Sequence, residues 1–85
     1  GFVEIYCRSN TSPETIQRGL ERYQEVVAAS TVTGDADAIA HIFAADMRHF
    51  ERVLERIAGE PFVERTKSVL VLSPLVRRFT SGSPA

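Results

Sequence analysis

The stretch VTGDADAIAHIFAAD, residues 32–46, contains the residue types of this chain best suited to binding a small polar molecule. Gly34 permits the positive φ of a tight turn, and backbone N–H groups exposed in such a turn can hold a carboxylate. Asp35 and Asp37 can accept hydrogen bonds from an ammonium group. A site for a zwitterion combines these two features, a group that holds the carboxylate and a group that holds the ammonium. Because aspartate is favoured in turns, the same pattern also fits a turn with no ligand, and both interpretations stay open.

Thr66 and Ser68 form a second polar group. They lie two residues apart in a segment that reads as a strand, so both side chains point to the same face and offer hydroxyls that can donate or accept. Leu70 is next on that face. We treat the two hydroxyls as a candidate polar group for a ligand.

Catalysis and metal binding are weaker interpretations of the same residues. Neighbouring carboxylates act as an acid and base pair only where burial and proximity separate their pKa values, and a surface turn offers little of either. Asp35, Asp37 and Asp46 lack the spacing of a calcium loop, and His41 and His49 do not form an H-x-x-x-H pair. We expect a protein that is not an enzyme, with no metal and no cofactor.

Composition bounds the class of protein. An 85-residue chain is one domain and buries only about 60% of the surface of its unfolded form. Ten basic and eleven acidic residues give no basic surface for nucleic acid. No stretch approaches the roughly 20 apolar residues of a membrane span, and no signal peptide is present. The single cysteine, Cys7, fits a buried thiol in a reducing compartment. We therefore expect a soluble, cytoplasmic protein, and a start without methionine suggests a fragment.

Hydrophobic periodicity predicts six elements. Strands are expected over residues 2–7, 25–33, 38–44 and 63–72, and helices over residues 11–24 and 46–58. The tail, residues 80–85, is small and polar and is expected to be disordered. The order strand, helix, strand, strand, helix, strand predicts a ferredoxin-like α+β fold, in which two helices cover one face of a four-stranded antiparallel sheet.

The helices have recognisable ends and faces. Thr11 and Glu14 have the spacing of a capping box, and Gly19 suggests that the first helix approaches the sheet closely. Asp46 is an N-cap residue type, and Gly59 ends the second helix. His49 is expected to be exposed. The predicted core positions of the helices are Ile16, Leu20, Tyr23, Met47, Phe50, Val53, Leu54 and Ile57.

The strands do not alternate as they would if water covered the second face of the sheet. Ala38, Ala40 and Ile42 point one way, while Ile39 and Phe43 point the other. The last strand ends in VLVL, apolar on both sides. Because two helices cover only one face, we expect a homodimer in which a second copy covers the other, sheet against sheet, as a dimeric α+β barrel. His41 is expected to be a core or interface residue.

The order of elements, the VTGDAD link, the AAD entry to the second helix and the segment PFVERTKSVLVL resemble the C-terminal domain of the Lrp/AsnC (leucine-responsive, feast/famine) transcriptional regulators, the regulation-of-amino-acid-metabolism domain. The resemblance covers residues 2–78. It implies a dimer that assembles further, up to an octamer, and an amino-acid effector held between dimers. Carried onto this chain, the effector-binding residues are Gly34, Asp35, Asp37, Thr66, Ser68 and Leu70.

Two departures from the family pattern stand out. Ala36 occupies a position where the family often has an aromatic residue, and the family's DNA-binding helix-turn-helix is absent from this chain. Contact with DNA is therefore expected only through a domain outside the chain. The alternative function is a stand-alone dimeric enzyme, such as a cofactor-independent oxygenase, which would have a long pocket between the sheet and the helices.

Overall fold

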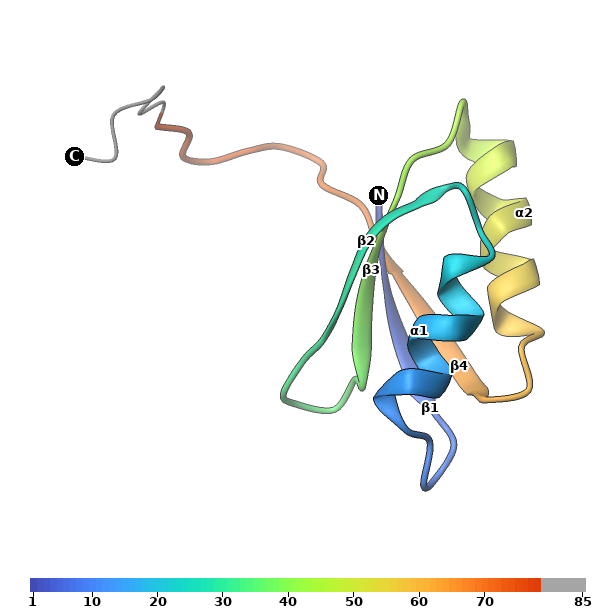
Figure 1. Ribbon diagram of the computed structural model, residues 1–85. Helices are drawn as coiled ribbons and strands as arrows, with labels where there is room; N and C mark the ends of the chain where they lie inside the picture. The colour runs from blue at the N-terminus through green and yellow to red at the C-terminus, as the bar shows by residue number, and fades with distance from the viewer. Residues whose placement is uncertain (79–85) are drawn as a thin grey trace.

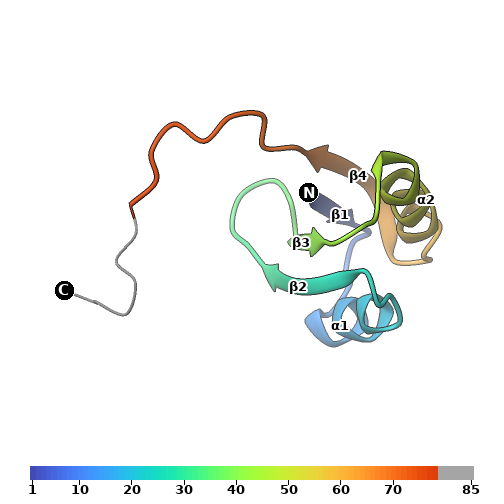
Figure 2. The same cartoon turned by 90° about the horizontal axis from the view of Figure 1, so that it is seen from above.

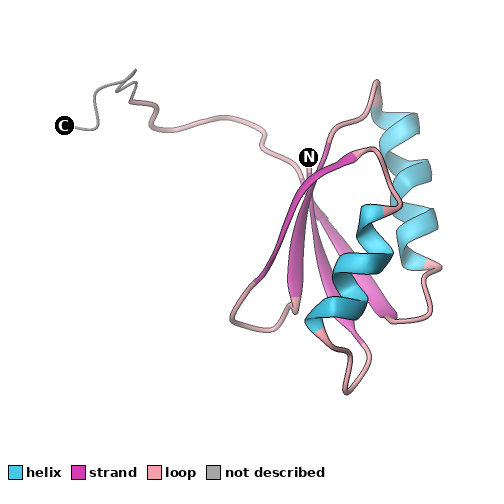
Figure 3. Ribbon diagram, viewed as in Figure 1, coloured by secondary structure: helices cyan, strands magenta, loops and turns pink. Residues whose placement is uncertain are grey.

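A computed structural model describes residues 1–78. Its elements, in order, are β1 (Phe2–Cys7), α1 (Pro13–Glu21), β2 (Val26–Thr31), β3 (Ala38–Ile42), α2 (Met47–Ala58) and β4 (Val63–Val69). All strand pairs are antiparallel, in the order β2-β3-β1-β4. Both helices lie on one side of the sheet (Figures 1 and 3). The predicted ferredoxin-like α+β fold is confirmed, whereas the predicted tail, residues 80–85, lies outside the described residues.

Three strands end earlier than predicted: β2 at Thr31, β3 at Ile42 and β4 at Val69. β4 pairs only with β1, and Val69 lies opposite Phe2, the first residue of β1. Residues 70–72 therefore have no partner strand, although their composition favours β structure. β3 ends at Ile42, because the chain turns there toward the start of α2. The end of β4 depends on where its partner β1 begins, which the local composition of residues 63–72 does not contain.

The predicted capping box of α1 is wrong. The N-cap is Ser12, whose side chain accepts a hydrogen bond from the Thr15 N–H. The Thr11 hydroxyl instead donates to the carbonyl oxygen of Arg8 at 2.6 Å. The prediction for α2 is confirmed: Asp46 is its N-cap and accepts from the His49 N–H at 2.8 Å, and the helix ends at Gly59.

The core lies between the helices and the sheet. Its buried members are Val3, Ile5, Ile16, Leu20, Tyr23, Ala38, Ala40, Ile42, Phe50, Val53, Ile57, Phe62 and Val63. Met47, expected in this core, is 52% exposed because it is the first residue of α2. Gly19 is buried, but it faces the Phe62 ring rather than the sheet, and a Cβ there would lie 2.8 Å from that ring.

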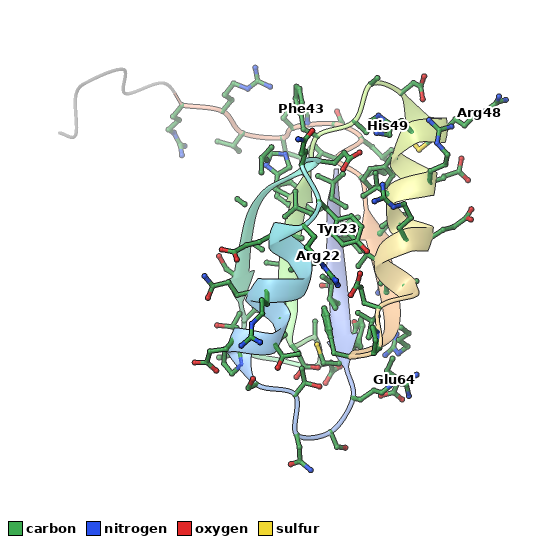
Figure 4. All side chains as sticks on the ribbon, turned by 45° about the vertical axis from the view of Figure 1, so that its right-hand side comes forward. Arg22, Tyr23, Phe43, Arg48, His49 and Glu64 are labelled. Carbon is green, nitrogen blue, oxygen red and sulfur yellow. The ribbon has the colours of Figure 1, made fainter. Side chains whose placement is uncertain are left out.

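Tyr23 ties α1 to α2 (Figure 4). Its hydroxyl donates to the carboxylate of Glu60, which also pairs with Arg22. The guanidinium of Arg56 lies 5.0 Å from the centre of the Tyr23 ring, within cation–π range. Burial, with the bond to Glu60, raises the pKa of Tyr23 to about 12, so the phenol stays neutral near neutral pH. This contact holds the C-terminal end of α1 against the C-terminal end of α2.

His49 is half-buried, not exposed as predicted. Its Nε2 lies 2.9 Å from a Glu25 carboxylate oxygen, and its Nδ1 accepts from the Ala45 N–H at 3.1 Å. With Nδ1 accepting from Ala45, Nε2 is the ring nitrogen that faces the Glu25 carboxylate. The pair joins the residue before β2 to the first turn of α2, two segments that are distant in sequence.

Replacing Glu25 should flatten the dependence of stability on pH. The hydrogen bond from His49 lowers the pKa of the Glu25 carboxyl below its ordinary 4.5. The interaction therefore stabilises the fold above that pH and is lost as the pH falls through the lowered value. Between about pH 5 and pH 3, we expect the melting temperature of Glu25→Gln to fall less than that of the wild type. Circular dichroism melts, with the exposed Glu55→Gln as control, test this. Parallel curves for the two variants would contradict it.

The second face of the sheet is uncovered in the single chain, but it is not uniformly apolar as expected. We call it the open face. At one end Phe2 lies opposite His41 and Val69, and the rings of Phe2 and His41 stack at 4.5 Å. The next row toward the other end places Glu4 between Ile39 and Lys67. The open face therefore has an apolar end and a polar end.

Candidate functional site

The connection between β2 and β3 is the turn that the sequence singled out. Gly34 has φ +108°, a conformation that favours glycine, and its closing bond runs from the Val32 N–H to the Asp37 carbonyl at 3.2 Å. Within the described chain, the four N–H groups of residues 33–36 donate to no protein atom. The connection curves out on the side of the sheet away from the helices (Figure 2). The fold does not use these N–H groups, and Thr33, Gly34 and Asp35 are exposed, an arrangement of the kind that can hold an anion.

Asp37 fixes this turn to the sheet. Its carboxylate accepts a hydrogen bond from the Cys7 N–H at 2.8 Å, and its own N–H donates to the carbonyl of Ile5 at 2.9 Å. Cys7 is half-buried, and burial, with the nearby Asp37 carboxylate, raises the pKa of its thiol. One carboxylate oxygen of Asp37 is therefore used in a hydrogen bond within the domain. Asp35 is exposed next to the N–H groups of the turn.

The two aspartates should behave differently when replaced. Asp37→Ala loses a charge-assisted hydrogen bond to the backbone, and we expect it to lower the free energy of unfolding by about 1 kcal/mol. Asp35→Ala should change it by less than about 0.5 kcal/mol. Urea denaturation measures both values, and hydrogen exchange of the Cys7 amide should accelerate only in Asp37→Ala. If the two variants lower the free energy of unfolding equally, the hydrogen bond from Cys7 to Asp37 does not contribute measurably to stability.

A hollow of about 440 Å³ lies between the turn and the open face. We call it the turn hollow. Its lining residues are Glu4, Tyr6, Val32, Thr33, Gly34, Asp35, Ala36, Ile39 and Lys67. Gly34 and Asp35 were expected at a binding site, whereas Glu4, Tyr6 and Lys67 were missed. The sequence does show that Glu4 and Lys67 are charged residues within strands. It does not show that they are neighbours, which depends on the register between β1 and β4.

The strand residues predicted for the binding site, Thr66, Ser68 and Leu70, do not lie at the turn hollow in this chain. Thr66 is opposite Ile5 and Ser68 is opposite Val3, and both partners are fully buried beneath the helices. The two hydroxyls therefore point to the helix side of the sheet, opposite the turn hollow. Leu70 follows the end of β4 and packs near Gly1 and Phe50. A single chain does not bring the predicted turn group and strand group together.

The space between the sheet and the helices is filled by the core. A groove of about 440 Å³ runs between α1 and the edge strand β2, but apolar and small residues such as Ile16, Leu20 and Ala29 form most of its lining. Within residues 1–78, no group of three His, Cys, Asp or Glu side chains could hold a metal ion. Neither helix of this part of the chain is long and apolar enough to cross a membrane.

This chain combines a ferredoxin-like sheet with a glycine-aspartate turn beside its open face. The chain belongs to the Lrp/AsnC ligand binding domain family, whose model matches residues 1–80. It is 46% identical over 77 residues to the HTH-type transcriptional regulator Rv2324 of Mycobacterium tuberculosis, covering 91% of this chain and 52% of that protein. The chain thus spans about half the length of this curated relative.

Two solved structures extend the comparison. E. coli AsnC has the same fold, with a TM-score of 0.79 and 22% identity over 92% of this chain and 53% of that one. The feast or famine regulatory protein Rv3291c of M. tuberculosis, solved in complex with L-methionine, has a TM-score of 0.73 and 28% identity over 89% of this chain and 51% of that one. By name, the curated relative is a transcriptional regulator and Rv3291c is a regulatory protein, and this kinship supports a domain that is not an enzyme.

Proposed function

We propose that this chain is the effector-sensing and oligomerising part of a transcriptional regulator, that its effector is an amino acid, and that it works in the cytoplasm. The observation that carries the proposal is the turn, which presents four free N–H groups beside the exposed Asp35. The L-methionine complex of a relative supports the choice of ligand class. DNA would be contacted by a helix-turn-helix domain outside this chain, as the name of the other relative suggests.

We propose that the open face is covered by a second copy. Phe2, His41 and Val69 form its apolar end, and β4 continues into an extended segment, residues 70–78, that leaves the domain (Figures 1 and 2). Leu72 and Leu75 of this segment are each 93% exposed. A second copy related by a twofold axis would bury both the open face and this segment. Assembly of dimers into an octamer remains a prediction from the family.

Effector binding would act by changing which assembly is populated. A ligand shifts an equilibrium only by its differential affinity for the two states. The turn lies at the edge of the open face. A ligand that contacts the turn would therefore also contact the neighbouring copies of the chain. Another copy of the chain would supply the remaining predicted residues of the site, Thr66, Ser68 and Leu70.

Calorimetry against the twenty amino acids tests the sensing role. We expect at least one to bind, and Gly34→Val to weaken its binding about tenfold or more, because the left-handed conformation costs a branched residue roughly 1–2 kcal/mol. Asp35→Ala should also weaken it, whereas Glu51→Ala on the exposed side of α2 should not. Light scattering with and without the ligand should show a change in assembly. No heat with any amino acid, together with an unchanged assembly, would exclude the role.

A further inference from the structure

His41 is the polar side chain in an otherwise apolar row at one end of the open face. The row crosses all four strands, as Ala28, His41, Phe2 and Val69. The imidazole stacks on the Phe2 ring, with 4.5 Å between the ring centres and 20° between the ring planes. His41 and Phe2 are only half-buried in the single chain. Water therefore reaches the imidazole as long as no second copy covers the row.

The charged groups nearest to this row do not pair with His41. Glu4 and Lys67 belong to the next row of the same face, and diagonal neighbours such as Glu4 and His41 are about 7–8 Å apart. The ammonium group of Gly1 donates to the carbonyl oxygen of Ile42 at 3.2 Å, and β2 has no charged side chain. Within residues 1–78, His41 forms neither a salt bridge nor a side-chain hydrogen bond.

Glu4 is the carboxylate of the open face that lies closest to His41 in register. It is half-buried, and it already accepts a hydrogen bond from the Tyr6 hydroxyl at 3.2 Å. Tyr6 and Glu4 point toward the turn hollow, which both of them line, and His41 is not part of that lining. The described chain therefore provides no carboxylate that would stabilise a charged imidazole at the apolar end.

A second copy on the open face would withdraw this row from water. Packed sheets lie about 10 Å apart, and the side chains of both faces fill the space between them. A neutral imidazole enters such a layer at the cost of a hydrogen bond, whereas a charged imidazole without a partner costs far more. The separated chains, in which water reaches the ring, therefore take up a proton more readily than the assembled chains.

We propose that His41 makes the association of two copies dependent on pH. The copies associate while both imidazoles are neutral, and they separate when acid protonates the two rings. Histidine changes its charge between about pH 5 and pH 8, so the change in assembly is expected in that interval. Because the separated chains bind two protons that the dimer excludes, Kd rises by up to about a hundredfold for each pH unit in the acid part of the interval. The inference rests on the proposed dimer and does not involve the turn hollow.

Sedimentation velocity of the 85-residue chain at about pH 7.5 and about pH 5.5, at one ionic strength, tests this inference. The Kd of the wild type should be at least about tenfold higher at the lower pH. His41→Gln, which stays neutral at both, should change by less than about twofold. His49→Gln makes the same substitution at the second histidine, which contacts Glu25 and lies outside the row, and it should follow the wild type.

Dilution calorimetry counts the protons directly. Heats of dissociation measured in two buffers of different ionisation enthalpy give the number of protons that the chains take up as they separate. At the lower pH we expect about two per wild-type dimer and close to none for His41→Gln. Equal proton uptake by these two proteins would assign the pH dependence to other groups and contradict the proposal.

The outcomes separate this inference from the dimer itself. If the wild type is dimeric at both pH values with a Kd that changes by less than about twofold, His41 is not a switch while the dimer stands. The same holds if His41→Gln loses association in acid as much as the wild type does. If the wild type is a folded monomer at the higher pH, both proposals fail. Circular dichroism at both pH values checks the fold, and unfolding of the wild type and His41→Gln alike in acid would also contradict the switch.

Discussion

Replacing Phe2 by aspartate is expected to convert the proposed dimer into a folded monomer. Phe2 lies at the apolar end of the open face, stacked on His41 and outside the core beneath the helices. Burying a phenylalanine side chain contributes about 1.5–3 kcal/mol, and twofold symmetry counts the loss twice. The dissociation constant should therefore rise by about 10²- to 10⁴-fold. Sedimentation velocity at micromolar concentration measures the change.

Met47→Asp is the control for this substitution. Met47 is also exposed, but it begins α2 on the helix side of the sheet. It should leave the assembly unchanged. If the wild type is itself a well-folded monomer at these concentrations, or if Phe2→Asp remains dimeric, the open face is not the interface and the basis for the twofold assembly is lost.

Replacing Ile5 by alanine should cause the largest loss of stability of any substitution considered for this chain. Ile5 is fully buried in β1, which has β3 on one side and β4 on the other. Truncation of such a residue removes its transfer free energy and leaves a cavity, at a cost of about 2–5 kcal/mol. For a domain of this size, each kilocalorie lowers the melting temperature by about 4–8 °C.

Urea denaturation at one fixed protein concentration measures the effect, because dissociation contributes to the apparent stability of a dimer. Val27→Ala is the control: Val27 is 57% exposed, and its truncation should cost less than about 1 kcal/mol. A loss for Ile5→Ala no greater than that of Val27→Ala would mean that β1 is not the centre of the core.

The order of elements and the inward faces of the strands were predictable because both depend on local periodicity. Ala38, Ala40 and Ile42 point into the core as their spacing indicated. The prediction of Thr11 as the N-cap was wrong, and Ser12 is the N-cap. The two adjacent hydroxyl residues have similar chemistry, so only the backbone conformation at each position decides between them. The contact of His49 with Glu25 joins residues 24 positions apart, and no local pattern encodes it.

The candidate site was predictable only in its turn. Gly34 and Asp35 were predicted from residue type and spacing, and both line the turn hollow, because the positive φ of Gly34 is a local property. Glu4 and Lys67 could not be found in this way, since their approach depends on the register between β1 and β4. The same register places Thr66 and Ser68 on the helix side, which their alternation alone did not decide.

The run from Val69 to Leu72 has consequences for the chain before it meets a partner. Four consecutive apolar residues with strong β propensity are exposed there, with no charge among them. Such a run is a template for aggregation when it is left unpaired. Pro74 interrupts it, and Arg77 and Arg78 follow within a few residues, as gatekeepers do in natural sequences. We therefore expect Pro74 and the two arginines to oppose fibre-like stacking of chains that have not yet met a partner.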